Sequence, residues 1–129
     1  MMPLLRLVEL PLWPDAGGLY DIRDRVRNQV DIPAIQNWLK TLDKEDYTPR
    51  RNYLSSDKLP EPLKWMSFGS VHLSVDENGN PFVDISAGGG FHHWGATIGM
   101  EDMVISESDL NSRYHSWLLV EPGFYVGEW

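Results

Sequence analysis

Hydrophobic positions follow the period of a helix in the first half of this chain. Leu19, Ile22 and Val26 recur at the spacing of one helix face, between charged residues on the other face. Asp31 is expected to cap a second helix, with Pro33 in its first turn. The apolar stripe of that helix comprises Ile32, Ile35, Trp38, Leu39 and Leu42. Residues 19–42 are therefore predicted to form two helices, or one helix broken near Val30.

Prolines and glycines bound this helical region. Residues 3–10 alternate weakly between apolar and polar and predict a strand, which Pro11 and Pro14 end. Residues 15–18, with two glycines, are predicted to form a turn. Residues 43–65 combine prolines with many charges, so they are predicted to be loop-rich, with one short helical turn at residues 62–66.

The period changes to two from residue 69, where apolar and polar residues alternate. This alternation predicts a half-buried strand up to residue 76 and a return strand over residues 81–86. The sequence Asp-Glu-Asn-Gly-Asn at residues 76–80 lies between them and is a strong hairpin signal. The two strands are therefore expected to pair antiparallel.

The length of the hairpin loop decides which side chains share a face. A two-residue loop would mix apolar and charged residues on each face. A three-residue loop, with Gly79 in the left-handed conformation, pairs Leu73 with Val83 instead. We therefore expect the three-residue loop, which also places His72 opposite Asp84 on the more polar face.

Further strands and one helical turn are predicted in the rest of the chain. Residues 91–100 present an apolar face from Trp94 to Met100, while Gly95 and Gly99 leave the other face open to close approach. Residues 106–112 begin with a capping pattern typical of a helical turn. Residues 114–120 are apolar on both faces, which predicts a central strand, and residues 124–126 predict a last short strand.

These elements define an α+β fold. We expect an antiparallel meander sheet of about five strands, with one or two N-terminal helices packed on one face. Its length of 129 residues is typical of a single domain. That domain would combine a strand and helical region at residues 1–66 with an antiparallel β region at residues 67–129.

Charge is distributed unevenly between the two halves. Residues 1–65 carry ten basic and ten acidic side chains, whereas residues 66–129 carry one cation, Arg113, and nine acids. The formal net charge of −8 thus arises entirely from the second half. A negative surface repels nucleic acid and attracts a basic partner or a metal ion.

Composition narrows the class of protein further. The chain has no cysteine, which excludes disulfide frameworks, thiolate zinc sites and cysteine nucleophiles. No stretch approaches the roughly 20 apolar residues of a membrane span, and the N-terminus lacks the pattern of a signal peptide. We therefore expect a cytoplasmic protein that binds neither nucleic acid nor membrane.

Candidate chemistry centres on the predicted polar face. His72, Asp84 and His93 could share it, and histidine with aspartate suits zinc or non-haem iron. The spacing matches no standard ligand motif, so no metal or cofactor is assigned. Ser86 with a histidine and Asp84 could form a hydrolytic arrangement, but the sequence lacks a nucleophile elbow. The three glycines at residues 88–90 precede no helix, so they do not indicate a phosphate site.

A protein-binding surface is the alternative that charge and aromatic residues favour. Aromatic anchors within a charged rim are typical of tight interfaces. The candidate binding residues are His72, Asp84, His93, Trp94, Glu101, Asp102 and Trp129. Small, acidic, cysteine-free and rich in aromatics, the chain resembles in composition the immunity proteins that neutralise basic bacterial toxins.

The sequence therefore favours a non-enzymatic binding module that engages a basic protein partner. One alternative is a metal-binding domain or small metal-dependent hydrolase on the His72, Asp84 and His93 face. Another is a structural domain that acts as a homodimer, with exposed tryptophan and tyrosine side chains buried between the copies.

Overall fold

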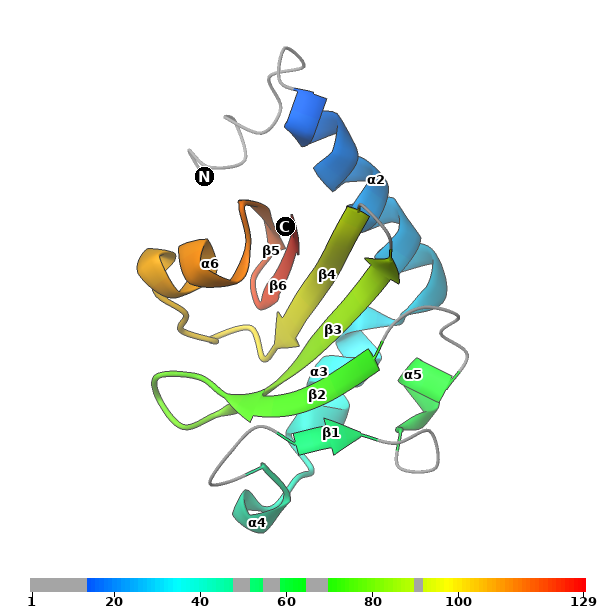
Figure 1. Cartoon of the computed structure of the whole chain (residues 1–129). Coiled ribbons are helices and arrows are strands. Elements are labelled where there is room, and N and C mark those ends of the chain that lie inside the picture. Colours follow the sequence, from blue (N-terminus) through cyan, green and yellow to red (C-terminus); the bar gives the residue numbers. More distant parts are fainter. Residues whose placement is uncertain (1–13, 48–51, 55–58, 65–69, 90–91) are drawn as a thin grey trace.

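Helices and one antiparallel sheet make up the part of the chain that the computed structural model describes, residues 14–47, 52–54, 59–64, 70–89 and 92–129. The helices are α2 (Pro14–Gln29), α3 (Ile32–Leu39), α4 (Lys44–Tyr47), α5 (Glu61–Lys64) and α6 (Glu107–Arg113) (Figure 1). The strands are β1 (Asn52–Leu54), β2 (Ser70–Val75), β3 (Pro81–Gly89), β4 (His92–Gly99), β5 (Ser116–Glu121) and β6 (Phe124–Glu128). The strand predicted for residues 3–10 lies outside the described residues.

The strand order confirms the predicted fold class, α+β with N-terminal helices on an antiparallel sheet. Within the described residues the order is β1-β2-β3-β4-β6-β5, and every neighbouring pair is antiparallel. The chain follows a meander from β1 to β4. The chain then forms the edge strand β5 and returns as β6, which lies between β5 and β4.

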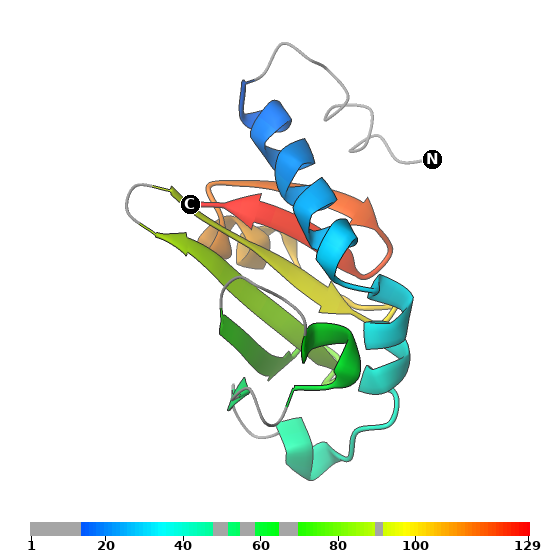
Figure 2. The same ribbon diagram turned by 90° about the vertical axis from the view of Figure 1, so that its right-hand side faces the viewer.

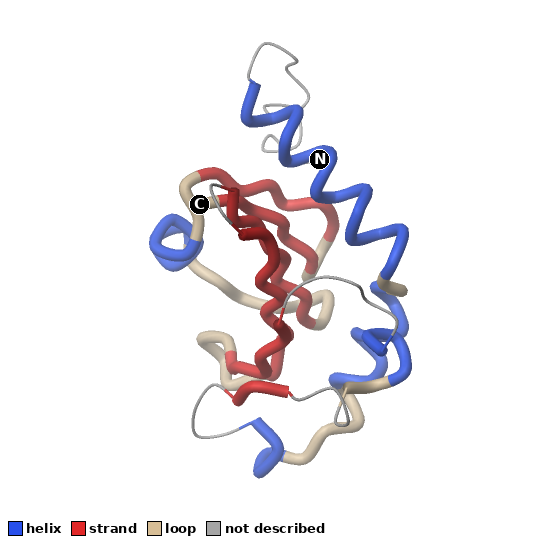
Figure 3. The backbone as a smooth tube through the Cα atoms, turned by 45° about the vertical axis from the view of Figure 1, so that its right-hand side comes forward, coloured by secondary structure: helices blue, strands red, loops and turns tan. Residues whose placement is uncertain are grey.

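The two faces of the sheet are covered by different helices. α2 and α3 lie across one face, and α6 lies against the other, as Figure 2 and Figure 3 show. The first face, under α2 and α3, comprises Val71, Leu73, Val83, Ile85, Trp94, Ala96, Ile98, Phe124 and Val126, all buried in the main core. The second face, toward α6, comprises His72, Phe82, Asp84, Gly95, Thr97, Gly99, Tyr125 and Gly127. Helices were predicted on one face only, so α6 adds a layer.

The predicted helical region forms two helices that break at Val30, as expected. Asp31 caps α3 by accepting a hydrogen bond of 3.1 Å from the Ala34 backbone N–H. The predicted stripes lie against the sheet: Leu19, Ile22, Val26, Ile32, Ile35 and Leu39 are buried, and Trp38 and Leu42 are partly buried. Burying a side chain of this size contributes about 1.5–3 kcal/mol.

The turn predicted at residues 15–18 is wrong, because α2 already begins at Pro14. Proline is favoured in the first helical turn, where its missing N–H has no partner to lose. Gly18 lies where α2 approaches the end of β6. A Cβ atom at this position would lie 3.1 Å from Oε2 of Glu128, so the glycine permits the close approach.

The predicted register of the β2–β3 hairpin is confirmed. Leu73 pairs with Val83, and His72 pairs with Asp84. Gly79 has a φ of +83°, the left-handed conformation that the three-residue loop requires. The Asp76 carboxylate accepts backbone hydrogen bonds within the loop, at 2.8 Å from Asn78 and 2.9 Å from Asn80.

The strand predicted as central, residues 114–120, is instead the edge strand β5. Its apolar character on both faces has a different cause, because helices cover both sides of this edge. α2 contacts β5 on the first face and α6 contacts it on the second. The segment predicted as loop-rich, residues 43–65, also contains the short elements α4 and β1, and α5 corresponds to the helical turn predicted at residues 62–66.

Candidate functional site

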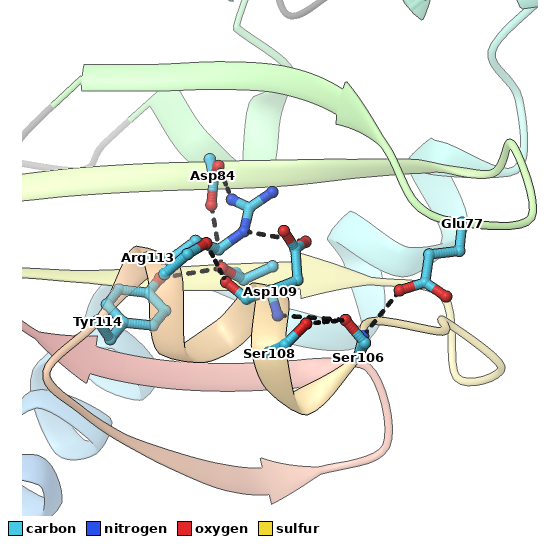
Figure 4. A network of polar contacts seen from close by, with 9 residues as sticks. Glu77, Asp84, Ser106, Ser108, Asp109, Arg113 and Tyr114 are labelled. Atoms are coloured by element: carbon cyan, nitrogen blue, oxygen red, sulfur yellow. Dashed lines mark hydrogen bonds and ion pairs between the residues drawn. The ribbon is translucent and has the colours of Figure 1, made fainter.

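A polar network on the second face begins with the helix that carries Arg113. Ser106 caps α6 by accepting a hydrogen bond of 3.1 Å from the Asp109 backbone N–H. The helix is short, and its last residue, Arg113, extends its side chain across the sheet toward β3. There Nη1 of Arg113 lies 2.5 Å from Oδ2 of Asp84 (Figure 4). Nε of the same guanidinium lies 3.6 Å from the Asp109 carboxylate.

The Asp84 carboxylate is the centre of this network. Its other oxygen accepts a hydrogen bond of 3.0 Å from the Thr97 hydroxyl on β4. Thr97 is itself 2.9 Å from the hydroxyl of Tyr114, which follows α6. The Asp84 side chain is 10% exposed and the Arg113 side chain 26%. An ion pair this buried depends on both partners, because either charge alone would lack compensation.

Burial and neighbouring charges act in opposite directions on Arg113. Burial of the guanidinium would by itself lower its pKa, because the charged form loses hydration. The charge of Asp84, its hydrogen bond and the charge of Asp109 outweigh this effect, so the pKa of Arg113 is raised above its ordinary value. Arg113 therefore stays protonated at physiological pH.

Aromatic rings extend the network toward the end of β4. The His93 and Trp129 rings are stacked, with centroids 5.9 Å apart and planes inclined by 14°. Tyr114 also contacts Trp129, with its ring centroid 5.7 Å from that of Trp129 and the two planes inclined by 43°. Gly127 makes room for Tyr114, since a Cβ there would fall on the Tyr114 ring. Close approach was predicted at Gly95 and Gly99: Gly95 is approached by the Ile85 carbonyl oxygen and the Trp129 ring, and Gly99 by the Met103 side chain.

A cavity of about 220 Å³ lies beside this cluster. It is lined by Asp84, Ser86, Arg113, Tyr114 and Trp129. A second cavity of about 260 Å³ shares Arg113, Tyr114 and Trp129 with the first. Both are smaller than the roughly 300 Å³ at which drug-sized ligand pockets begin. They are therefore suited only to small ligands or to single side chains of a partner.

A separate acidic surface lies at the other end of α6. Backbone and side-chain hydrogen bonds join the β2–β3 hairpin to the segment between β4 and α6. Asp76 accepts from the Val104 N–H at 3.1 Å, and Glu77 accepts from the Ser106 N–H at 3.0 Å. We define the acidic rim as the exposed carboxylates that this connection gathers: Glu77, Glu101, Asp102 and Glu107.

One apolar side chain is exposed within the acidic rim. Val104 is 42% exposed, and with Trp129 it is one of two large hydrophobic residues exposed in the described part of the chain. The nearest described cation is Lys40, which follows α3 directly and whose Nζ lies 3.7 Å from Glu101. That contact is solvent-exposed on both sides and stabilises little. The acidic rim therefore keeps a strong negative character.

The structure separates the sequence-predicted binding residues into three locations: the second face, the acidic rim and the core. Asp84 and Trp129 line one cavity, His93 stacks on Trp129, and His72 lies opposite Asp84 in the strand register. Glu101 and Asp102 belong to the acidic rim. Trp94, which was included among the binding residues, instead lies in the core under the first face and is only 6% exposed. The Arg25 guanidinium lies 5.9 Å from its ring.

A metal-ligand cluster is not assembled in the described part of the chain. Among those residues, no group of three histidine, aspartate or glutamate side chains lies close enough to hold an ion. Asp84 is instead engaged by Arg113 and Thr97, and His93 by Trp129. None of the described helices has the length and apolar character needed to cross a membrane.

Sequence reasoning missed Arg113, Thr97 and Tyr114 as members of the site. One signal was available for Arg113, the only cation among nine acids in the second half. It also follows Asp109 by four residues, and because α6 extends one residue beyond the predicted turn, both lie on one face of the helix. Thr97 and Tyr114 carried no such signal, because their contact depends on how α6 lies over the sheet.

Comparison with known proteins identifies no relative. Neither family models, nor curated proteins, nor solved structures gave a match. The class of protein is therefore defined by its own architecture: an α+β domain with a buried Asp–Arg network on one face and an acidic rim at one end.

Proposed function

We propose that this chain is a non-enzymatic binding domain that engages a basic protein partner through the acidic rim. The observation that carries the proposal is the exposure of four carboxylates, Glu77, Glu101, Asp102 and Glu107, around the exposed Val104. Charged rims around an apolar contact are the common arrangement of specific interfaces. The net charge of −8 adds long-range attraction for a basic partner.

Preorganisation of the acidic rim supports the same proposal. The rim residues come from a hairpin and a loop, which are segments that commonly move. Here Asp76 and Glu77 accept backbone hydrogen bonds from Val104 and Ser106, and the Glu77 N–H donates to the Val104 carbonyl at 3.4 Å. A surface already held in place loses less conformational entropy on binding.

The arrangement of the second face favours binding over catalysis. A general base needs a group free to accept a proton from substrate. The Asp84 carboxylate is occupied by Arg113 and Thr97 and is nearly buried. This pair is suited to holding α6 on the sheet, which in turn places Glu107 and Ser106 beside Glu77.

A charge-reversal experiment tests the proposal. The rim variant is Glu101→Lys/Asp102→Lys/Glu107→Lys, and the matched control reverses three exposed acids of the first half, Asp21→Lys/Asp24→Lys/Glu45→Lys. Both variants carry the same net charge, so they differ only in where the charge lies. Proteins crosslinked to each form in a lysate are identified by mass spectrometry, and the selected partner is then purified and its association rate measured.

We expect a partner with a basic isoelectric point that binds the wild type and the control variant. Its association with the rim variant should be slower by about tenfold or more, and the difference should shrink as salt is added. Equal binding by the two variants, or crosslinks confined to residues 1–65, would show that the acidic rim is not the interface.

A further inference from the structure

The cavity beside Trp129 has features of a ligand site that the acidic rim does not explain. It lies at the opposite end of α6 from the rim and is lined by Asp84, Ser86, Arg113, Tyr114 and Trp129. Two of these residues form the buried ion pair, so part of its wall is fixed in place. Trp129 is 42% exposed, and its ring orientation is set by the stacked His93 and by Tyr114.

The charge balance of the lining restricts the class of ligand. The cavity is lined by one carboxylate and one guanidinium, which neutralise each other at 2.5 Å. An added anion would be repelled by Asp84, and an added cation would be repelled by Arg113, so neither ion would gain much from binding beside the pair. A neutral ligand with both donors and acceptors is not repelled by either group.

Hydrogen-bonding groups remain available in the same wall. The Arg113 guanidinium has five N–H donors. Its Nη1 and Nε face Asp84 and Asp109, while Nη2 makes no hydrogen bond to the described residues. The Ser86 side chain also lines the cavity without a hydrogen bond to any described residue. A hydroxyl group of a ligand can accept from the guanidinium and exchange a hydrogen bond with the serine.

We propose that this cavity binds a neutral, hydroxyl-rich ring, that is, a single sugar unit. The hydroxyls would bond to Arg113 and Ser86, and the apolar face of the ring would lie on the exposed part of the Trp129 indole. The volume of about 220 Å³ limits the ligand to one ring, free or at the end of a glycan. The proposal stands apart from the acidic rim and does not depend on it.

The test follows the indole N–H signal of Trp129 in two-dimensional NMR spectra of the full chain. The probes are methyl glycosides of glucose, galactose, mannose and N-acetylglucosamine, with acetate and methylguanidinium as charged comparisons. Each is added to about 50 mM, above the millimolar affinity expected from a few hydrogen bonds and one ring contact. At least one glycoside should shift the signal saturably, and the two ions should not.

Two variants connect that shift to the cavity. Trp129→Ala removes an exposed ring and should weaken glycoside binding by at least about tenfold. Binding to the variants is measured by saturation transfer from the protein to the glycoside. Val104→Ala removes the other exposed hydrophobic side chain and should leave binding unchanged. The proposal is overturned if no glycoside binds, if only an ion binds, or if both variants bind the glycoside equally well.

Discussion

Among the described residues, each face of the sheet carries one ion pair between a helix arginine and a strand carboxylate, and the two pairs differ in burial. On the first face, Arg27 of α2 lies 2.8 Å from Glu121 of β5, and both side chains are about two-fifths exposed. On the second face, Arg113 of α6 lies 2.5 Å from Asp84 of β3, which is nearly buried. The same two chemical groups thus form a surface contact on one face and the centre of the packing on the other.

This difference follows from what else holds each helix. α2 and α3 bury a continuous set of aliphatic side chains, and Gln36 of α3 donates a buried hydrogen bond to the Gly99 carbonyl, so the exposed Arg27 pair contributes little to holding them. α6 has only seven residues, and Leu110 is the only one of them that is buried. Its attachment therefore depends on the buried pair, the cap at Ser106 and the neighbouring Tyr114. A polar network of this kind stabilises only while all of its members are present.

The largest effect is expected from Arg113→Ala. Removing the guanidinium leaves the Asp84 carboxylate nearly buried without its charge partner. Loss of one member of a buried pair costs about 3–5 kcal/mol, and the partial exposure of Arg113 places the expected loss near the lower limit, about 3 kcal/mol. Urea unfolding followed by circular dichroism measures the change in free energy of unfolding.

Arg27→Ala is the matched control from the first face. An exposed pair contributes about 0.2–1 kcal/mol, so this variant should lose far less stability than Arg113→Ala. Adding Asp84→Asn to Arg113→Ala should recover part of the loss, because the uncompensated charge is then absent. Equal losses for the two arginines would mean that burial does not distinguish the two pairs.

Gly127→Ala is expected to have the next largest effect, and it tests how the second face accepts aromatic rings. A Cβ at residue 127 would fall on the ring of Tyr114, which must then move away from Thr97. Overpacking of this kind typically costs about 1–3 kcal/mol. Thermal unfolding of the variant measures the loss, and Tyr114→Ala should make the added methyl group nearly neutral.

Gly79→Ala provides the comparison with a glycine that has free space around it. No heavy atom would lie within 4 Å of a Cβ at residue 79, so its cost comes from the positive φ of +83° alone. This loss should persist in the Tyr114→Ala background. A Gly127→Ala cost that also persists there would show that Tyr114 is not the neighbour that requires the glycine.

The sequence predicted the first face more completely than the second. Helical spacing identified the buried side chains of α2 and α3, and the matching of apolar faces identified the β2–β3 register. Each of these inferences needs only local periodicity. The edge position of β5 did not follow from periodicity, because a strand covered by helices on both sides has the same apolar pattern as a central strand.

The second face depends on contacts that periodicity does not encode. The pairing of His72 with Asp84 was predicted, since both lie in one hairpin. The contact of Asp84 with Arg113 was not, because the two residues are 29 positions apart and belong to different elements, β3 and α6. Gly95 and Gly99 signalled close approach, yet the side chains that approach them, Trp129 and Met103, come from later segments whose course periodicity does not predict. Long-range polar partners are thus the part of the site that a single sequence leaves open.

The smallest expected effect is a change in the free energy of unfolding in alkaline solution, caused by a tyrosine in the outer part of the second face. Tyr125 of β6 lies there, with its ring centroid 6.0 Å from that of Trp117, and burial raises the pKa of its phenol. In the unfolded chain a tyrosine titrates near pH 10. Between that pH and the higher pKa of the folded state, unfolding releases the Tyr125 proton, so the free energy of unfolding should fall as the pH rises.

Tyr125→Phe isolates this contribution. Below about pH 10 the folded and unfolded states both keep the phenol protonated, so the slope of stability against pH should not differ between the variant and the wild type. Above that pH the variant should lose less stability than the wild type, measured as the melting temperature at increasing pH. If Tyr125→Phe keeps the full wild-type decline, the outer part of the second face is open enough for the phenolate to be hydrated in the folded state.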